Sequence, residues 1–167
     1  PNGSGARVLA LHTGSLWDGR FRLVAIDNHG LATRTAYVDD WPLVLITAPV
    51  DCGLAGDNPF YAPIPLTGAD NVVRALVFYP PEASDLAVQF IASGGLPDRP
   101  CGSQGALEPT GLHGNLFQGR LDLTSCGPDA VGERFELAIT VSASYTEPGG
   151  EQRQASHSIR AMVEAGQ

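Results

Sequence analysis

Apolar residues alternate with polar or small ones along Phe135 to Tyr145, which is the most regular pattern in the chain. A period of two places every second side chain on the same face of a β-strand. No apolar pattern holds a helical period over ten residues, and the alternative of one or two helical turns is open only for Glu82 to Phe90. We therefore expect an all-β chain with little helix. The side chains expected to be among the most buried are Phe135, Leu137, Ile139 and Val141.

Short β-prone runs separated by turn residues continue along the whole chain. Asn28-His29-Gly30 separates two of them, and because Asn and Gly tolerate positive φ, this tripeptide predicts a tight hairpin. A succession of such strands and turns is typical of a β-sandwich. The strands that we expect are Arg7 to His12, Arg20 to Asp27, Leu31 to Val38, Leu43 to Thr47, Tyr61 to Thr67, Val72 to Tyr79, Leu86 to Ala92, Leu116 to Thr124, Phe135 to Tyr145 and Ser156 to Val163.

Two segments depart from the simple strand pattern. Pro63 and Pro65 stand at alternate positions, and proline lacks a backbone donor, so this segment is expected at the edge of a sheet. Residues 93–115 are rich in glycine and proline and show neither a period of 2 nor one of 3.6. We expect them to form a long irregular loop, which is uncommon in a compact domain unless it is functional, disordered or cross-linked.

The chain has three cysteines, Cys52, Cys101 and Cys126, and each is followed by glycine. Because no CxxC spacing exists, a zinc site is not expected. The simplest interpretation is one disulfide with one odd thiol in an oxidising compartment, and the alternative is three free thiols in a cytosolic protein. We predict that Cys101 and Cys126 are joined, since this bond closes the least regular stretch, and that Cys52 is free.

Charge and hydropathy exclude several partners. The formal net charge is −8, and all ten basic residues are arginines that are dispersed along the chain, so a nucleic-acid partner is not expected. No apolar run approaches the roughly 18 residues that a membrane helix needs, so membrane insertion is not expected. The absence of lysine and the content of Gly, Pro, Thr and Ser favour an extracellular or cell-surface location over a cytosolic one.

Two segments resemble each other and a known architecture. Asp18 to Ile26 is similar to Gly132 to Thr140, and both resemble the last hairpin of bacterial immunoglobulin-like and fibronectin-like domains, where a Gly-x-Phe/Tyr-x-Leu strand precedes the closing strand. Ile46 to Val50 resembles the opening strand of such a domain, and so does Leu66 to Asp70. The resemblance implies an immunoglobulin-like antiparallel β-sandwich with extra N-terminal strands.

This resemblance divides the chain into residues 43–167, the sandwich, and residues 1–42, the extra strands and hairpin. About three strands cannot form an independent core. We therefore expect residues 1–42 to pack on the main domain or on a neighbouring subunit. The alternative is one enlarged sandwich of ten or so strands.

The search for chemistry finds no local catalytic motif. No His pair has the HExxH spacing, and neither a GxSxG elbow nor a phosphate loop is present. Ser156-His157-Ser158 is expected on a solvated strand face. Acid-containing turns could supply calcium ligands, but Asp and Asn also populate turns for local reasons. We expect no enzyme activity, no cofactor and no metal site.

The remaining candidates are binding surfaces. The β-prone segment of Val8, Leu9, Ala10 and Leu11 is expected to meet a partner by strand addition to an open sheet edge. Among the aromatic residues, Phe60 and Tyr61 are the predicted ligand-binding pair, because planar rings cover sugar faces. The leading hypothesis is a non-catalytic structural module, a subunit or stalk of a surface filament or adhesin, whose partners are copies of itself or another surface protein. The alternative is a carbohydrate- or protein-binding module attached to a larger secreted enzyme, with a glycan as a possible partner.

Overall fold

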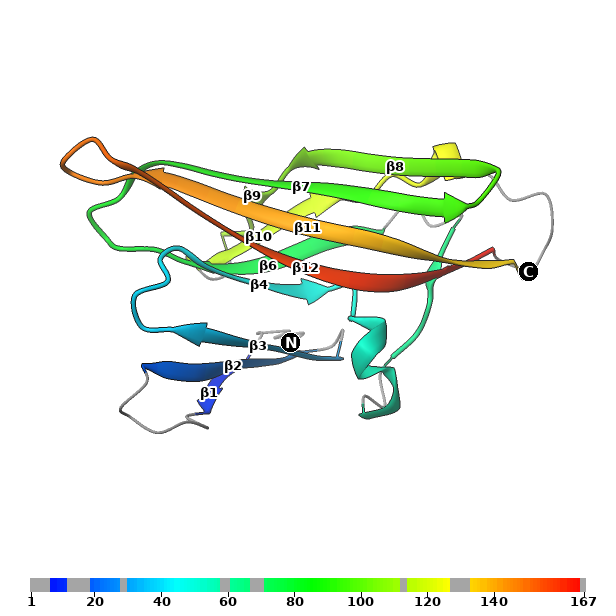
Figure 1. Cartoon of the computed structure of the whole chain (residues 1–167), viewed down its shortest axis with the longest axis horizontal. Coiled ribbons are helices and arrows are strands. Elements are labelled where there is room, and N and C mark those ends of the chain that lie inside the picture. The colour runs from blue at the N-terminus through cyan, green and yellow to red at the C-terminus, as the bar shows by residue number, and fades with distance from the viewer. Residues whose placement is uncertain are drawn as a thin grey trace.

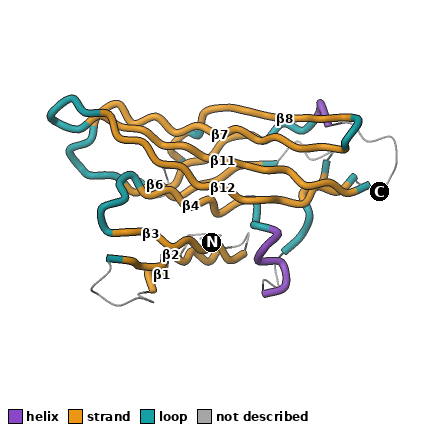
Figure 2. Tube along the Cα trace, viewed as in Figure 1, coloured by secondary structure: helices purple, strands orange, loops and turns teal. Residues whose placement is uncertain are grey.

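A computed structural model of the chain confirms an all-β fold (Figure 1). It describes residues 7–11, 19–27, 30–57, 61–66, 71–111, 114–126 and 133–165, with the backbone alone at 7–11, 27 and 57. Strands account for most of this part of the chain, and the only helical segments within it are two short 3-10 helices, η1 (Cys52–Asp57) and η2 (Thr124–Cys126) (Figure 2). The strands form three separate sheets, which are called A, B and C below.

Sheet A contains the N-terminal strands. Its order is β1 (Arg7–Leu11), β2 (Arg20–Asp27) and β3 (Gly30–Tyr37), all antiparallel to their neighbours. The register of β2 and β3 closes at the pair Asp27 and Gly30. The hairpin expected around Asn28-His29-Gly30 is therefore confirmed, although residues 28 and 29 lie outside the described part.

Sheet B lies between the other two sheets. Its order is β4 (Leu43–Ala48), β6 (Val72–Phe78), β10 (Leu116–Arg120) and β9 (Glu108–Pro109). All six residues of β4 are buried, because one face of this sheet packs on sheet C and the other on sheet A. A strand covered on both faces loses the usual alternation, which explains the continuous apolar run from Leu43 to Ala48.

Sheet C is the largest sheet. Its order is β5 (Ile64–Pro65), β12 (Gln152–Glu164), β11 (Arg134–Thr146), β7 (Ser84–Leu96) and β8 (Arg99–Ala106). The strands β7, β11 and β12 each have 13 residues, which corresponds to roughly 43 Å at 3.3 Å per residue. The proline-containing segment forms the edge strand β5, as predicted, but only two of its residues pair with β12.

The expectation of an irregular loop over residues 93–115 is wrong. β7 continues to Leu96, and β8 pairs with it from Arg99 to Ala106. The glycines are needed where strands approach closely: a Cβ on Gly94 would collide with the backbone oxygen of Glu136, and Gly95 has a φ of 105°. The helical alternative for Glu82 to Phe90 is also wrong, because β7 begins at Ser84.

Two hydrophobic cores separate the three sheets. The larger one lies between sheets B and C, and it includes the four residues expected to be among the most buried: Phe135, Leu137, Ile139 and Val141 are at most 7% exposed. The smaller one lies between sheets A and B and joins Leu23, Ala25, Ala32 and Ala36 to Leu43, Leu45, Leu76 and Leu116. The N-terminal sheet thus packs on sheet B of its own chain.

Candidate interaction surfaces

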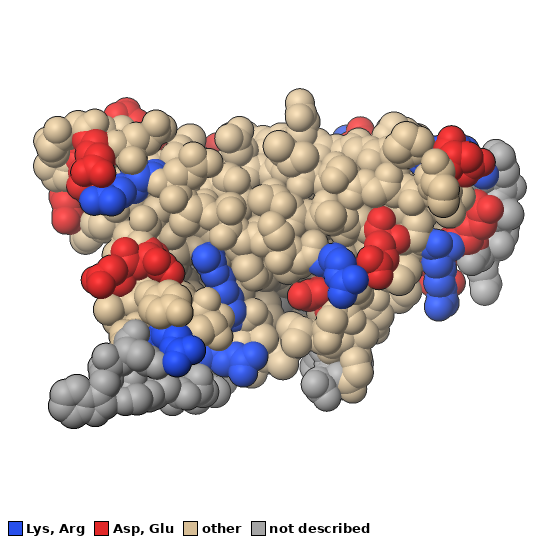
Figure 3. All heavy atoms as spheres, in the orientation of Figure 1, with Lys and Arg blue, Asp and Glu red and all other residues tan. Residues whose placement is uncertain are grey.

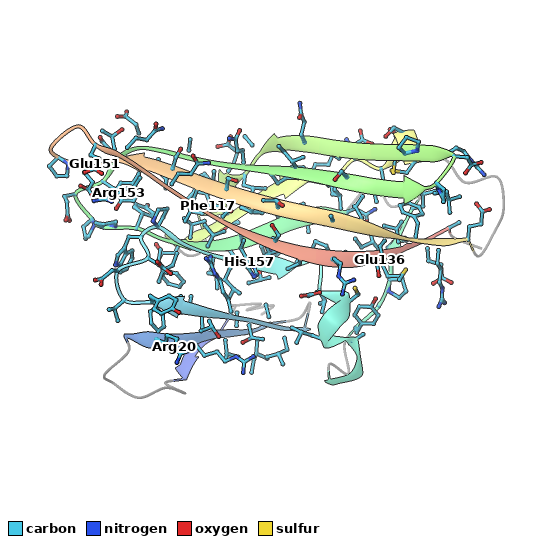
Figure 4. All side chains as sticks on the ribbon, viewed as in Figure 1. Arg20, Phe117, Glu136, Glu151, Arg153 and His157 are labelled. Atoms are coloured by element: carbon cyan, nitrogen blue, oxygen red, sulfur yellow. A yellow bond between two sulfur atoms is a disulfide. The ribbon has the colours of Figure 1, made fainter. Side chains whose placement is uncertain are left out.

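The strand β4 is an edge of sheet B. Two side chains from the neighbouring sheets form hydrogen bonds with backbone groups of this strand. Arg34 on β3 donates from Nη1 to the carbonyl oxygen of Val44 at 2.6 Å. From the opposite side, the backbone N–H of Ile46 donates to Nδ1 of His157 on β12 at 3.1 Å (Figure 4). A sheet edge presents unpaired backbone groups that can recruit another strand. The two side chains therefore protect this edge and tie the three sheets together.

His157 is half-buried, which corrects the expectation of a solvated face for Ser156-His157-Ser158. The alternation of β12 holds for the two serines, which are exposed, while the histidine points toward β4. Burial, followed by the nearby positive charge of Arg34, lowers the pKa of His157 to about 4, and Asp51 acts weakly in the opposite direction. The imidazole is therefore neutral at pH 7, as an acceptor at Nδ1 must be. Burial also lowers the pKa of Arg34, with Asp40 opposing.

Acidification is expected to destabilise the protein through His157. Above pH 6.5 the ring is neutral in both the folded and the unfolded chain. Between pH 6.5 and about 4 the unfolded chain binds a proton that the folded chain does not bind, so the free energy of unfolding falls with pH, and the loss is complete below about 4. We expect a loss of about 1–3 kcal/mol, the lower end allowing for solvent at a half-buried ring.

The measurement is urea unfolding at pH 7, 5.5 and 4, with His157→Asn as the matched variant. An asparagine oxygen accepts the Ile46 bond without titrating, so the variant is expected to show a flatter pH dependence than the unmodified chain. Other acids contribute equally to both proteins, so the difference between the two curves isolates the histidine. Parallel curves would contradict the assignment.

The predicted disulfide is present. Cys101 on β8 is bonded to Cys126 in η2, with 5.0 Å between the Cα atoms, and Cys52 is a free thiol of intermediate exposure. Around this bond, the N–H of Asp122 donates to Oγ of Ser103 at 3.2 Å, and Oγ of Ser125 donates to the Gly102 oxygen at 3.3 Å. The segment after β10 is thereby attached to the edge strand β8.

The structure places the residues predicted to bind partners in two regions. Val8, Leu9, Ala10 and Leu11 pair in register with Ala25, Val24, Leu23 and Arg22 of their own chain, and their side chains lie outside the described part. Phe60 also lies outside it. Tyr61 is partly buried beside Cys52 rather than displayed, and burial together with that neighbour raises the pKa of its hydroxyl. Both binding assignments remain predictions.

Exposed rings occur instead at the connection from β3 to β4. Tyr37 is 48% exposed, Trp41 is 40% exposed, and Val38 between them is 57% exposed. The indole N–H of Trp41 donates to the carbonyl oxygen of Val38 at 3.0 Å, which fixes the orientation of the ring. Tyr37 could not be recognised from its sequence context, because the residues of its strand give no sign of which face is covered.

The outward face of sheet C carries no charge over most of its length, and we call this area the neutral face. In Figure 3 it is the broad area without red or blue over β7, β8, β11 and β12. The strand registers place 14 uncharged outward residues there: Ala87, Gln89, Ile91, Ser93, Gly102, Gln104, Ala106, Ala138, Thr140, Ser142, Ser144, Gln154, Ser156 and Ser158.

Charges flank the neutral face at both ends, where they pair with each other. Arg160 and Glu136 approach to 3.5 Å at one end, and Arg153 contacts Glu147 at 2.9 Å at the other. Within the face, the hydroxyls of Thr140 and Ser158 are hydrogen-bonded at 2.8 Å. Ile91 is 59% exposed near the centre and borders a shallow hollow formed with Ala92, Gly102, Ser103 and Gln104.

In the part of the chain that the structure describes, no three His, Cys, Asp or Glu side chains converge as a metal ion would require. No helix among the described residues has the length and hydropathy to cross a membrane.

Comparisons with protein-family models, with curated proteins and with solved structures found no match for this chain.

Proposed function

We propose that this chain is a non-catalytic extracellular structural module, a subunit or stalk of a surface assembly that joins its neighbours by strand addition. The observation that carries the proposal is the position of β1 at the end of sheet A. In the described part of the chain β1 pairs with β2 on one side, and its other edge has no strand beside it. An open edge of this kind can accept an extended segment of a partner through main-chain hydrogen bonds.

The treatment of two other edges, β4 and β5, supports this choice. On sheet B, the edge strand β4 is occupied by Arg34 and His157. On sheet C, the edge strand β5 carries Pro65 and has only two paired residues. Natural β-proteins protect edges in such ways when further pairing is unwanted. Against these, β1 is a five-residue edge of apolar composition with a single arginine at its start.

Two finer assignments belong to the same proposal. Sheets B and C would be the two sheets of an immunoglobulin-like sandwich, since they share one core, β4 opens this part of the chain and the β11–β12 hairpin closes it. The extracellular location is supported by the Cys101–Cys126 disulfide, because disulfides persist in oxidising compartments.

Deleting residues 1–12 is expected to abolish association through β1 while the chain stays folded. The test compares native mass over a concentration series, with electron microscopy for fibres, for the full chain and for the truncated chain. Deletion of residues 1–6 alone is the matched control, because it removes sequence before β1 begins at Arg7 and should leave association intact. Thermal unfolding followed by circular dichroism reports whether each variant folds.

Two outcomes would contradict strand addition at β1. If the chain without residues 1–12 loses its cooperative unfolding transition, β1 belongs to its own core. If that chain associates as the full chain does, the partner binds elsewhere.

A second candidate function, carbohydrate binding, rests on one observation. Tyr37 and Trp41 are both exposed on the same β3–β4 connection. Aromatic rings displayed with one apolar face and one polar end are common at binding surfaces. A titration in which an oligosaccharide saturates the protein, and in which Trp41→Ala abolishes the binding, would favour this function over assembly.

A further inference from the structure

We propose that the neutral face of sheet C is a second association surface and that its partner is the same face of another copy of this chain. The inference rests on the proposed assembly function and adds a contact that β1 does not supply. An extended assembly needs at least two contacts per subunit, and an isologous pairing of one face supplies one of them.

Charge is distributed unevenly over the surface. The chain carries 18 acidic and ten basic residues, yet the outward rows of sheet C that pass through Thr140, Ser142 and Ser144 are uncharged on every strand, and the row through Ala138 carries a charge at its β12 end, Arg160. With a net charge of −8, two copies repel each other over most approaches. The neutral face is the surface on which they can meet without placing like charges together. Depletion of charge is also what distinguishes the centre of protein interfaces from other surface.

The shape of the face favours the same pairing. Its residues are mostly small, and two sheets with small side chains can pack closely face to face. Ile91 is the exposed large apolar side chain among the residues of the face, at 59% exposure, and it would form the apolar centre of the contact. No aromatic ring lies on the face, so it lacks the platform that a glycan would use.

The symmetry of the strands also supports the pairing. Thr140 and Ser158 pair with each other, and each is the midpoint of its strand, β11 or β12; Ile91 pairs with the same Thr140. A two-fold axis lying along this central row would place the row on its own copy, with Ile91 against Ile91. The Arg160–Glu136 pair of one copy would then lie over the serine-rich half of the other, away from its counterpart.

The area sets the strength of the contact. Strands about 4.8 Å apart and same-face residues about 6.7 Å apart give each outward residue roughly 32 Å². The 14 positions of the face thus cover roughly 450 Å² per copy, which is at the weak end of specific interfaces. The dimer should therefore be reversible and depend on concentration.

The experiment is sedimentation velocity over a concentration series with Ile91→Arg. Two arginines brought face to face repel and lose solvent, so we expect the variant to dimerise at least about tenfold more weakly. Ile26→Arg is the matched control, because Ile26 is also an exposed isoleucine, with 49% of its surface accessible, but it lies on sheet A. It should associate through the neutral face as the unmodified chain does. All proteins are the full chain, so contacts through β1 contribute equally to each, and the difference between Ile91→Arg and its control reports the neutral face.

A rescue makes the test specific. An equimolar mixture of Ile91→Arg and Ile91→Asp should form mixed dimers, because the axis places position 91 against itself and the opposite charges then attract. The proposal is overturned if the unmodified chain is monomeric at every concentration, if Ile91→Arg associates normally, or if Ile26→Arg weakens association as much. Deletion of residues 1–12 tests the contact through β1 and Ile91→Arg tests the neutral face, so the two proposals can fail separately.

Discussion

Replacing Phe90 by alanine is expected to lower the free energy of unfolding by about 3–5 kcal/mol, more than any other single substitution proposed here. Phe90 is 1% exposed and lies in the core between sheets B and C. Its ring also lies against the edge strand: a Cβ on its paired residue, Gly105, would come within 3.1 Å of the ring. Removing the ring leaves a cavity in the core and uncovers a glycine in β8, so the surroundings cannot easily collapse to fill the space.

The adjacent Ile91 provides the control. It lies on the same strand with its side chain on the opposite face, and it is 59% exposed. Ile91→Ala is expected to change stability by less than about 0.5 kcal/mol, measured at a concentration low enough for the chain to be monomeric. Urea unfolding gives both values. If Phe90→Ala does not fold, Phe90→Leu, which leaves a smaller cavity, should still show a clear loss. A loss below about 1 kcal/mol for Phe90→Ala would mean that the two sheets do not pack as described.

The same contrast explains which elements could be predicted from the sequence. Where one face of a strand is buried and the other is in solvent, as in β11, the alternation is visible in the residues and predicts both the strand and its core face. The strand β2 was predicted with its observed bounds for the same reason. β4 was predicted from its apolar run, but the reason for that run, a third sheet on its outer face, cannot be seen in the sequence.

The strand β8 shows where sequence patterns fail. Its residues Gly102 and Gly105 have no side chain, so the period of two disappears even though exposure alternates along the strand. Gly94 and Gly95 suggested that the strand ends there. In fact Gly94 allows a close approach to the backbone of the next strand, and Gly95 adopts a positive φ, while the strand continues. Glycine marks loops and crowded strands alike, and only the neighbouring strand distinguishes the two.

The candidate surfaces could be predicted still less. Ser156-His157-Ser158 contains no sign that its histidine accepts a bond from Ile46, 111 residues away. The neutral face likewise combines residues from four strands, and each strand taken alone has an ordinary polar face. The disulfide could be predicted because only three cysteines are available. The choice among them rested on the irregular composition of the stretch that the bond closes, although β8, β9 and β10 occupy much of that stretch.

Replacing both Cys101 and Cys126 by serine is expected to lower the free energy of unfolding by about 3 kcal/mol. The bond joins residues 25 apart. In the chain-entropy account, most of the effect arises in the unfolded chain, which gains the freedom of an open segment of this length once the bond is absent. For a chain of this size the midpoint of thermal unfolding should fall by roughly 6–12 °C.

The free thiol provides the control for this change. Cys52 makes no disulfide, so Cys52→Ser is expected to alter the midpoint by far less than the double variant does. A reductant should lower the midpoint of the unmodified chain to that of the double variant and leave the double variant unchanged. A midpoint insensitive to reductant, or a non-reduced peptide map that links Cys52, would show that the bond between β8 and η2 is absent in solution. The segment from Leu121 to Cys126 would then be held by the buried side chains of Leu121 and Leu123 and by the hydrogen bonds from Asp122 to Ser103 and from Ser125 to Gly102. The two exposed hydrogen bonds, each contributing about 1 kcal/mol, do not replace the cross-link.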